Sequence, residues 1–312
     1  MKIRSLAVAS LFVLSVASAA ATTITENFSS DPLTHGWKTF GNTNLFHWNS
    51  TQQNLEVTWD STNANSYFYL PLGTVLTVDD NFSVGFDLQL TDVPVANGFE
   101  IALGFLNFNS ATRTNFFRGS GYESPNLAEF DYFPDFFSPS LTTVDTNSTF
   151  NFLFDAVPLE NGTTYRIEFS HTAGMPFVTG QILTNGVVYG TFPTPYTTTN
   201  FTDFRLDAFS VSSFSDVNGY GSSILAHGIV DNFSAALPPP PVQNLSGKFS
   251  GGQWQAKFLS RSNWIYALER SADLQNWSSV TNGISGNGTN LFLSDANTPV
   301  DKGFYRIRAE RP

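Results

Sequence analysis

The stretch Ser83-Val84-Gly85-Phe86-Asp87-Leu88-Gln89-Leu90 alternates apolar side chains with small or polar ones. A period of two residues is typical of a β-strand that buries only one of its faces. The same period returns from Phe99 to Phe105 and from Tyr165 to Phe169, and no long stretch shows the period of an amphipathic helix. The sequence therefore predicts an all-β protein.

A turn signal supports antiparallel pairing. Asn185-Gly186 separates the apolar run Val178 to Leu183 from the run Val187 to Phe192. Asn-Gly favours a two-residue hairpin because both central residues of a type I′ turn need positive φ. About a dozen strand-like segments fit into roughly 215 residues without an internal repeat, which exceeds an immunoglobulin-like sandwich and favours a large antiparallel jelly roll.

Composition excludes several classes of protein. The 312 residues are 41% hydrophobic, 15% aromatic and only 13% charged, which is too apolar for a disordered chain. Cysteine is absent, so disulfides, thiolate metal sites and cysteine nucleophiles are excluded. The 31 phenylalanines supply much of the area that a packed core must bury.

The N-terminus has the pattern of a signal peptide. Lys2 and Arg4 precede an apolar run from Leu6 to Val16, and Ala17-Ser18-Ala19 matches a cleavage site. Residues 1–19 are therefore expected to be removed, and the mature protein to be secreted or held at the cell surface. An exported chain without cysteine favours a bacterial origin. No later stretch reaches the roughly 20 apolar residues of a transmembrane helix.

Charge and proline content predict two domains. Residues 20–241 carry five Lys and Arg against 21 Asp and Glu, whereas residues 242–312 carry eight against five. The proline-rich segment 237–241 between them predicts a stiff linker, which bounds an N-terminal domain at 20–236 and a small β-sandwich at 242–312. The acidic first domain disfavours nucleic acids and anionic surfaces and favours cations or neutral ligands.

The second domain is expected to contain four or five short strands, with candidates at Trp254 to Phe258, Trp264 to Arg270, Leu291 to Ser294 and Phe304 to Arg308. It resembles a small C-terminal β module that is appended to exported proteins of some environmental bacteria. Arg306 and Arg308 share a strand face with Phe304. This basic strip has three interpretations: contact with acidic polymers of the cell envelope, contact with the acidic first domain, or a solvated face.

The segment Leu127-Ala128-Glu129-Phe130-Asp131-Tyr132-Phe133-Pro134-Asp135 carries the most informative chemistry. On a strand, Glu129 and Asp131 share one face, roughly 7 Å apart at their Cα atoms. A Ca²⁺ ion would relieve their repulsion, with Asp135 as a further ligand. Two alternatives stay open: a catalytic pair of a glycosidase, and an acidic strand that faces a solvated groove.

Residues 129–135 also resemble the metal-binding strand of legume lectins, whose pattern is Glu-[Phe/Leu]-Asp-Thr-[Tyr/Phe]-x-Asn. The resemblance implies that Glu129, Asp131 and Asp135 are metal ligands and that Ca²⁺ is the cofactor. The pattern departs at Tyr132, which replaces Thr, and at Asp135, which replaces Asn. Ser140 stands where the family has a further Asp ligand, so the resemblance favours a single calcium ion or none.

The same strand resembles the motif Glu-x-Asp-x-(x)-Glu of laminarinase-type glycoside hydrolases. Glu129 and Asp131 match its first half, but Phe133 and Pro134 occupy both positions permitted for the final Glu. This departure disfavours hydrolysis and favours a relative that only binds its ligand, so no catalytic residue is assigned.

The wider first domain resembles concanavalin A-like and laminin G-like jelly rolls of exported bacterial proteins. The opening stretch from Glu26 to Asp31 and through Gly36-Trp37, and the closing stretch from Gly228 to Ser234, are similar to the paired terminal strands of that fold. The resemblance implies a concanavalin A-like antiparallel sandwich, although a fold does not by itself define a function.

A saccharide ligand would need aromatic faces and polar groups close to the acidic strand. The candidates are Arg118, Tyr122, Asn126, Tyr132, Phe136 and Phe137. Core packing is the alternative for each aromatic residue. The sequence thus favours an exported, lectin-like protein that binds a neutral polysaccharide or glycan. The alternatives are a structural or adhesive surface protein and, third, a glycoside hydrolase or polysaccharide lyase.

Overall fold

The computed structural model describes residues 21–93, 101–114, 124–134, 138–151, 157–189, 196–197, 200–215, 225–299 and 303–312. The predicted signal peptide at 1–19 lies outside these ranges. None of the helices in the described ranges is long and apolar enough to cross a membrane. These ranges contain one short α-helix, α1 (Phe108–Ala111), and two 3₁₀ helices, η1 (Pro32–His35) and η2 (Thr43–Leu45).

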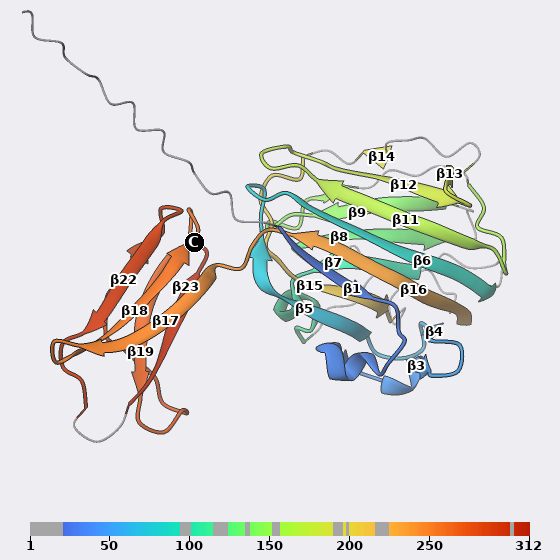
Figure 1. Ribbon diagram of the computed structural model, residues 1–312. Helices are drawn as coiled ribbons and strands as arrows, with labels where there is room; N and C mark the ends of the chain where they lie inside the picture. Colours follow the sequence, from blue (N-terminus) through green and yellow to red (C-terminus); the bar gives the residue numbers. More distant parts are fainter. Residues whose placement is uncertain are drawn as a thin grey trace, which may run out of the picture.

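The first domain consists of two antiparallel sheets that face each other (Figure 1). Over the described residues, sheet A has nine strands, seven of them in the spatial order β13 (Val187–Val188), β12 (Val178–Thr184), β11 (Thr164–His171), β6 (Phe82–Asp92), β16 (Leu225–Leu237), β4 (Asn54–Asp60) and β3 (Phe46–Asn49). The other two are β1 (Thr22–Glu26), which pairs with β16, and β14 (Tyr196–Thr197), which pairs with β12.

Sheet B lies behind sheet A and carries the acidic strand near its centre (Figure 1). Where the chain is described, its seven strands follow the order β10 (Phe150–Asn151), β9 (Ser138–Val144), β8 (Leu127–Phe133), β7 (Ile101–Leu106), β15 (Leu206–Ser213), β5 (Ser66–Leu76) and β2 (Lys38–Phe40). The structure therefore confirms the predicted all-β, antiparallel jelly-roll sandwich.

Local sequence explains two features of this topology. Leu183 pairs with Val188 across Asn185-Gly186, and both turn residues have positive φ, 51° and 76°. The predicted hairpin is confirmed, although its second strand ends at Val188. β1 runs antiparallel to the end of β16, so that the first and last strands of the domain pair as the resemblance implied.

Aromatic side chains hold the two sheets together. The Trp37 ring stacks on Phe68 at 4.9 Å between centroids and meets the ring of Phe233 edge-on at 5.3 Å. Phe86 of sheet A and Phe209 of sheet B lie 5.9 Å apart in the same core, and both are fully buried. Because such rings bury a large apolar area, they account for the stability of a chain that has no disulfides.

The second domain is built from two small antiparallel sheets. The described residues form sheet C from β17 (Val242–Ser250), β18 (Gln253–Ser260) and β22 (Asn290–Asp295). They form sheet D from β20 (Ser278–Ser279), β19 (Ile265–Ser271), β21 (Ile284–Ser285) and β23 (Phe304–Glu310). The four candidate strands correspond to β18, β19, β22 and β23, whereas β17 and the two-residue strands β20 and β21 were not among the candidates.

The predicted basic strip is neutralised within the second domain. Glu269 accepts hydrogen bonds from Arg306 at 2.7 Å and from Arg308 at 3.0 Å, and Arg308 also pairs with Glu310. The Arg306 guanidinium lies over the Trp277 ring, 4.2 Å from its centroid. These pairings leave the strip with little free positive charge.

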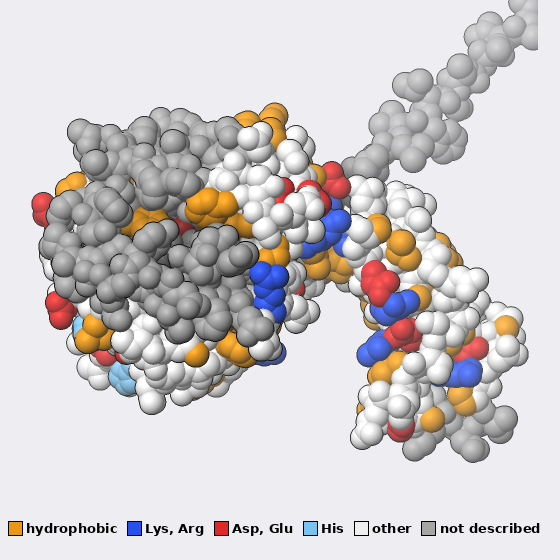
Figure 2. Space-filling view, turned by 180° about the vertical axis from the view of Figure 1, so that it is seen from behind, with side chains coloured by type: hydrophobic (Ala, Val, Ile, Leu, Met, Phe, Trp, Pro, Cys, Tyr) orange, Lys and Arg blue, Asp and Glu red, His pale blue; other side chains and the backbone are white. Residues whose placement is uncertain are grey.

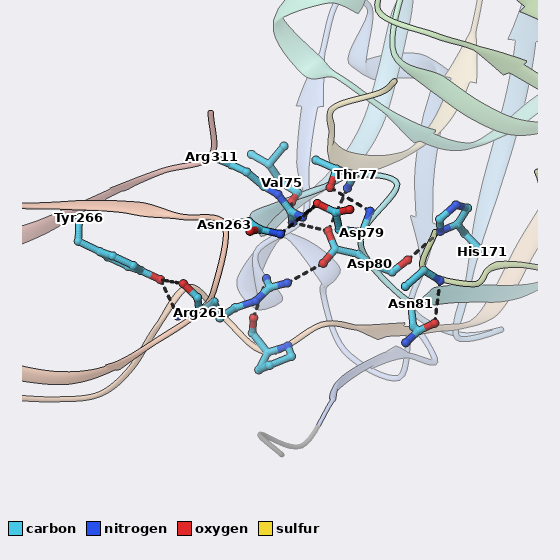
Figure 3. A network of polar contacts seen from close by, with 12 residues as sticks. Val75, Thr77, Asp79, Asp80, Asn81, His171, Arg261, Asn263, Tyr266 and Arg311 are labelled. Atoms are coloured by element: carbon cyan, nitrogen blue, oxygen red, sulfur yellow. Dashed lines mark hydrogen bonds and ion pairs between the residues drawn. The ribbon is translucent and has the colours of Figure 1, made fainter. Parts of the chain in front are cut away.

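Other arginines join the second domain to the first. Asp80 lies on the turn between β5 and β6 and accepts a 2.6 Å hydrogen bond from Arg261 and another from Arg311 (Figure 3). The Asp80 side chain is only 2% exposed, so these charges interact away from bulk water. We call this cluster of Asp80, Arg261 and Arg311 the interdomain latch.

The latch makes a first testable prediction. Asp80→Asn keeps the side-chain size but removes the buried charge that Arg261 and Arg311 share, so we expect it to lower the free energy of unfolding by about 3 kcal/mol. Chemical denaturation measures this loss, and small-angle X-ray scattering should show an expanded molecule because the domains separate.

The matched control is Asp79→Asn, on the same turn. Asp79 also faces Arg311, at 3.3 Å, but its side chain is 55% exposed. An exposed pair of this kind contributes less than about 1 kcal/mol. Equal losses in the two variants would contradict the latch.

Candidate functional site

Strand β8 turns its two carboxylates away from the core. Phe130 points toward sheet A, where its ring meets Phe86 at 6.4 Å. Tyr132 points the same way, and its hydroxyl accepts a 3.0 Å hydrogen bond from the backbone N–H of Leu159. Because side chains alternate along a strand, Glu129 and Asp131 occupy the opposite face of sheet B. We call this the outer face.

Each carboxylate lies in a row of residues that runs across the strands of sheet B, because residues directly opposed on neighbouring strands share a face. The Glu129 row consists of Thr142 on β9, Glu129 on β8, Gly104 on β7 and Ser210 on β15. The Asp131 row consists of Ser140, Asp131, Ala102 and Ser212 on the same four strands. The outer face thus combines two carboxylates with four hydroxyls and two small residues.

Both rows are shielded from water. Glu129 is 1% exposed and Asp131 is 0% exposed. The hydroxyls form pairs along their strands, Ser140 with Thr142 at 3.3 Å and Ser210 with Ser212 at 3.0 Å. A solvated acidic strand, one of the interpretations of the sequence, is therefore wrong. Burial of carboxylates costs free energy unless other groups compensate the charge, so this face is specialised for polar contacts.

Gly104 determines how closely β7 approaches the Glu129 row. A Cβ atom on residue 104 would lie 2.3 Å from the Cβ of Glu129 and 2.5 Å from the carbonyl oxygen of Ala128. Such distances are far below van der Waals contact, and rigid backbone is among the atoms involved. Glycine is therefore required here to let Glu129 take its place on the sheet.

We expect Gly104→Ala to displace Glu129 and to lower the free energy of unfolding by about 3 kcal/mol, because the added methyl group overpacks a buried site. Thermal denaturation followed by circular dichroism measures the loss. Ala102→Gly, at the equivalent position opposite Asp131, is the control and should cost only about 1 kcal/mol. Unchanged stability of Gly104→Ala would show that the strands do not approach so closely.

Two predicted ligand residues are in the wrong place to act with the carboxylates. Tyr132 packs between the sheets, and its burial raises the pKa of the phenol. Asn126 has positive φ, and its side-chain oxygen accepts hydrogen bonds from Thr146 and from the backbone N–H of Arg205. Both predictions are corrected here: Tyr132 is a core residue, and Asn126 fixes the turn before β8.

The other predicted site residues lie outside the described ranges. They are Arg118, Tyr122, Asp135, Phe136 and Phe137.

The donors on the outer face suit a hard cation better than a transition metal. The described residues contain no group of three or more His, Asp or Glu that could hold a metal ion. The two rows offer carboxylate and hydroxyl oxygens, which are ligands that Ca²⁺ accepts. All four histidines lie elsewhere, in η1 or on strands of sheet A. A legume-lectin site also holds a transition metal. The two rows offer no nitrogen ligand for such a metal.

Sequence reasoning missed the hydroxyl side chains that lie in the same rows as the carboxylates. Ser210-Val-Ser212 and Ser140-Leu-Thr142 both alternate hydroxyl and apolar side chains. This pattern is typical of any half-buried strand, so it becomes a signal only when the register aligns it with Glu129 and Asp131.

No family model and no curated protein matches the sequence. Solved structures do match. They include lectin II from Ulex europaeus, at a TM-score of 0.47 and 12% identity over 71% of this chain and 100% of that one. Peanut lectin with a nine-residue peptide matches at a TM-score of 0.44 and 12% identity, over 70% of this chain and 99% of that one. A carbohydrate esterase from the Shiga toxin-encoding bacteriophage phi24B matches at a TM-score of 0.46 and 13% identity, over 70% of this chain and 100% of that one.

At 12–13% sequence identity, these similarities concern the fold of the chain and not its function. The two sheets, their strand order and the paired terminal strands make the first domain an antiparallel jelly-roll sandwich, as the sequence predicted. Its ligand has to be argued from its own residues.

Proposed function

We propose that the chain is an exported, lectin-like protein that binds a neutral polysaccharide or glycan on the outer face of sheet B. The observation that carries this proposal is the pair of buried carboxylates at 129 and 131, aligned in register with the hydroxyls of two neighbouring strands. Carboxylates accept hydrogen bonds from the hydroxyls of a sugar, and serine and threonine hydroxyls both donate and accept.

The charge of the domain supports a neutral ligand. The jelly roll carries many more acidic than basic residues, which repels anionic polymers. Binding without hydrolysis is favoured because Phe133 and Pro134 stand where laminarinase-type enzymes carry their acid/base Glu.

A calcium ion is a further part of the proposal. Glu129 and Asp131 would hold it, with Asp135 as the third carboxylate. The ion would neutralise their repulsion and orient the carboxylates toward sugar hydroxyls.

Substitution of the carboxylates tests the binding proposal. Asp131→Asn and Glu129→Gln should each weaken glycan binding about ten- to hundredfold, because a hydrogen bond to a charged group contributes about 1.5–3 kcal/mol. A glycan array of neutral oligosaccharides followed by isothermal titration measures the loss, and circular dichroism checks that each variant is folded.

The control is Asp203→Asn, a carboxylate of the same domain whose side chain is 50% exposed and pairs with Arg205. Unchanged glycan binding by both site variants would contradict the proposed site. Binding to cells but to no glycan would favour the adhesive alternative. Release of reducing ends from a β-glucan, abolished by Glu129→Gln, would favour the hydrolase.

Calcium is tested separately by titration of the chelated protein. We expect one Ca²⁺ per chain with a heat that Asp131→Asn removes, and glycan binding that EDTA abolishes and Ca²⁺ restores. Full glycan binding in EDTA would exclude a role for the ion while leaving the site itself in place.

Export is proposed on the N-terminal pattern alone. N-terminal sequencing of the protein released by a secreting host should start at Ala20, after the Ala-Ser-Ala motif. A mature chain that keeps Lys2 and Arg4 would contradict it.

A further inference from the structure

A second concave site lies where the two domains meet. The domains diverge from the latch and leave a hollow between them (Figure 2). A groove of about 420 Å³ is lined there by β5, α1 and β15 of the jelly roll on one side and by Pro241, Trp264 and Ala309 of the second domain on the other. Its volume lies within the range of about 300–1,000 Å³ that is usual for ligand pockets, and domain interfaces are a preferred place for them.

One wall of the groove is aromatic. The rings of Tyr69 and Phe108 stack at 4.1 Å between centroids, and Phe40 supports Phe108 edge-on at 5.8 Å. The Tyr69 hydroxyl has no hydrogen-bond partner among the described residues. On the opposite wall, Trp264 is held between Arg261 and Arg311 of the latch, 5.7 and 5.8 Å from its ring. The latch thereby fixes the width of the groove.

Two buried polar atoms of residues that line this groove have no partner in the described part of the chain. The hydroxyl oxygen of Thr74 and the indole nitrogen of Trp264 make no hydrogen bond, although Thr74 is 8% exposed and Trp264 only 3%. Both residues line the groove. Buried polar atoms without partners are rare and call for an explanation such as a missing ligand or water. Both atoms are enclosed, so an ordered water, and not the ligand itself, would have to supply those partners.

The charged and polar side chains of the groove favour a neutral ligand. Lys38 and Asp207 contribute one positive and one negative charge, and Asn109 adds an exposed amide. Asp207 accepts a 2.8 Å hydrogen bond from the backbone N–H of Phe108, and burial raises the pKa of its carboxyl. An aromatic wall next to a few polar groups matches a sugar ring, which has an apolar C–H face and hydroxyls at its edge.

We propose that the interdomain groove is a second saccharide-binding site, which takes the end of a neutral oligosaccharide against Tyr69. This inference shares only its ligand class with the proposed function. Tyr69 is paired in register with Ser210, so it continues the Glu129 row on the same face of sheet B. Three strand spacings of about 4.8 Å separate Tyr69 from Glu129. A long polysaccharide would therefore reach both sites and hold the two domains in one orientation.

The test is isothermal titration of the full mature chain with cellohexaose, laminarihexaose and mannohexaose. We expect two sites per chain for at least one of these hexasaccharides. Tyr69→Ala should remove one site, and Tyr69→Phe and Asn109→Ala, which remove only polar groups, should weaken that same site about tenfold. Phe292→Ala is the matched control, because Phe292 is an exposed aromatic residue of the second domain outside the groove.

The outcomes separate the two proposals. A single site that Asp131→Asn abolishes and that all three groove variants leave unchanged would overturn the groove and keep the proposed function. A single site that Tyr69→Ala abolishes, with full binding by Glu129→Gln and Asp131→Asn, would support the groove and overturn the outer face. Absence of binding to all three hexasaccharides would overturn the groove as a site for neutral glucan and mannan chains.

Discussion

The packing of sheet A on sheet B through aromatic rings is the constraint on which the rest of the structure depends. Because Phe130 and Tyr132 are committed to that core, the pleat of β8 turns Glu129 and Asp131 to the other side. A shift of one residue in register would place the carboxylates among the phenylalanines of the core and turn the rings onto the outer face. The chemistry of the outer face is therefore a direct consequence of hydrophobic packing on the inner face.

The second constraint is electrostatic and acts between the domains. A buried ion pair is seldom a large source of stability, but its loss is costly because each partner is left as an uncompensated charge. In the latch, Asp80 is held by two arginines that come from well-separated parts of the second domain, Arg261 before β19 and Arg311 after β23 (Figure 3). Such a contact fixes an orientation, and here the orientation creates the groove between Tyr69 and Trp264.

Local periodicity was enough to predict much of this architecture. The alternation around Phe86, the Asn185-Gly186 turn and the faces of β8 each depend on a few neighbouring residues, and the structure agrees with all three. The burial of Glu129 and the alignment of Ser210 with Gly104 could not be predicted in this way, because they depend on strands that are distant in sequence.

The errors have physical causes as well. Asn126 was interpreted as a ligand residue, but an asparagine before a strand also tolerates the left-handed conformation that its turn needs. The charge imbalance left attraction between the domains as one of three interpretations of the basic strip. It could not indicate which arginines are involved, and Arg306 and Arg308, the obvious pair, are neutralised within their own sheet by Glu269.

A crystal structure of the mature chain grown with a neutral hexasaccharide tests the central claim most directly. The account predicts sugar density on the outer face of sheet B, with hydroxyls within hydrogen-bond distance of Glu129 or Asp131. Ordered sugar elsewhere on the molecule, with both carboxylates still enclosed and out of its reach, would contradict it.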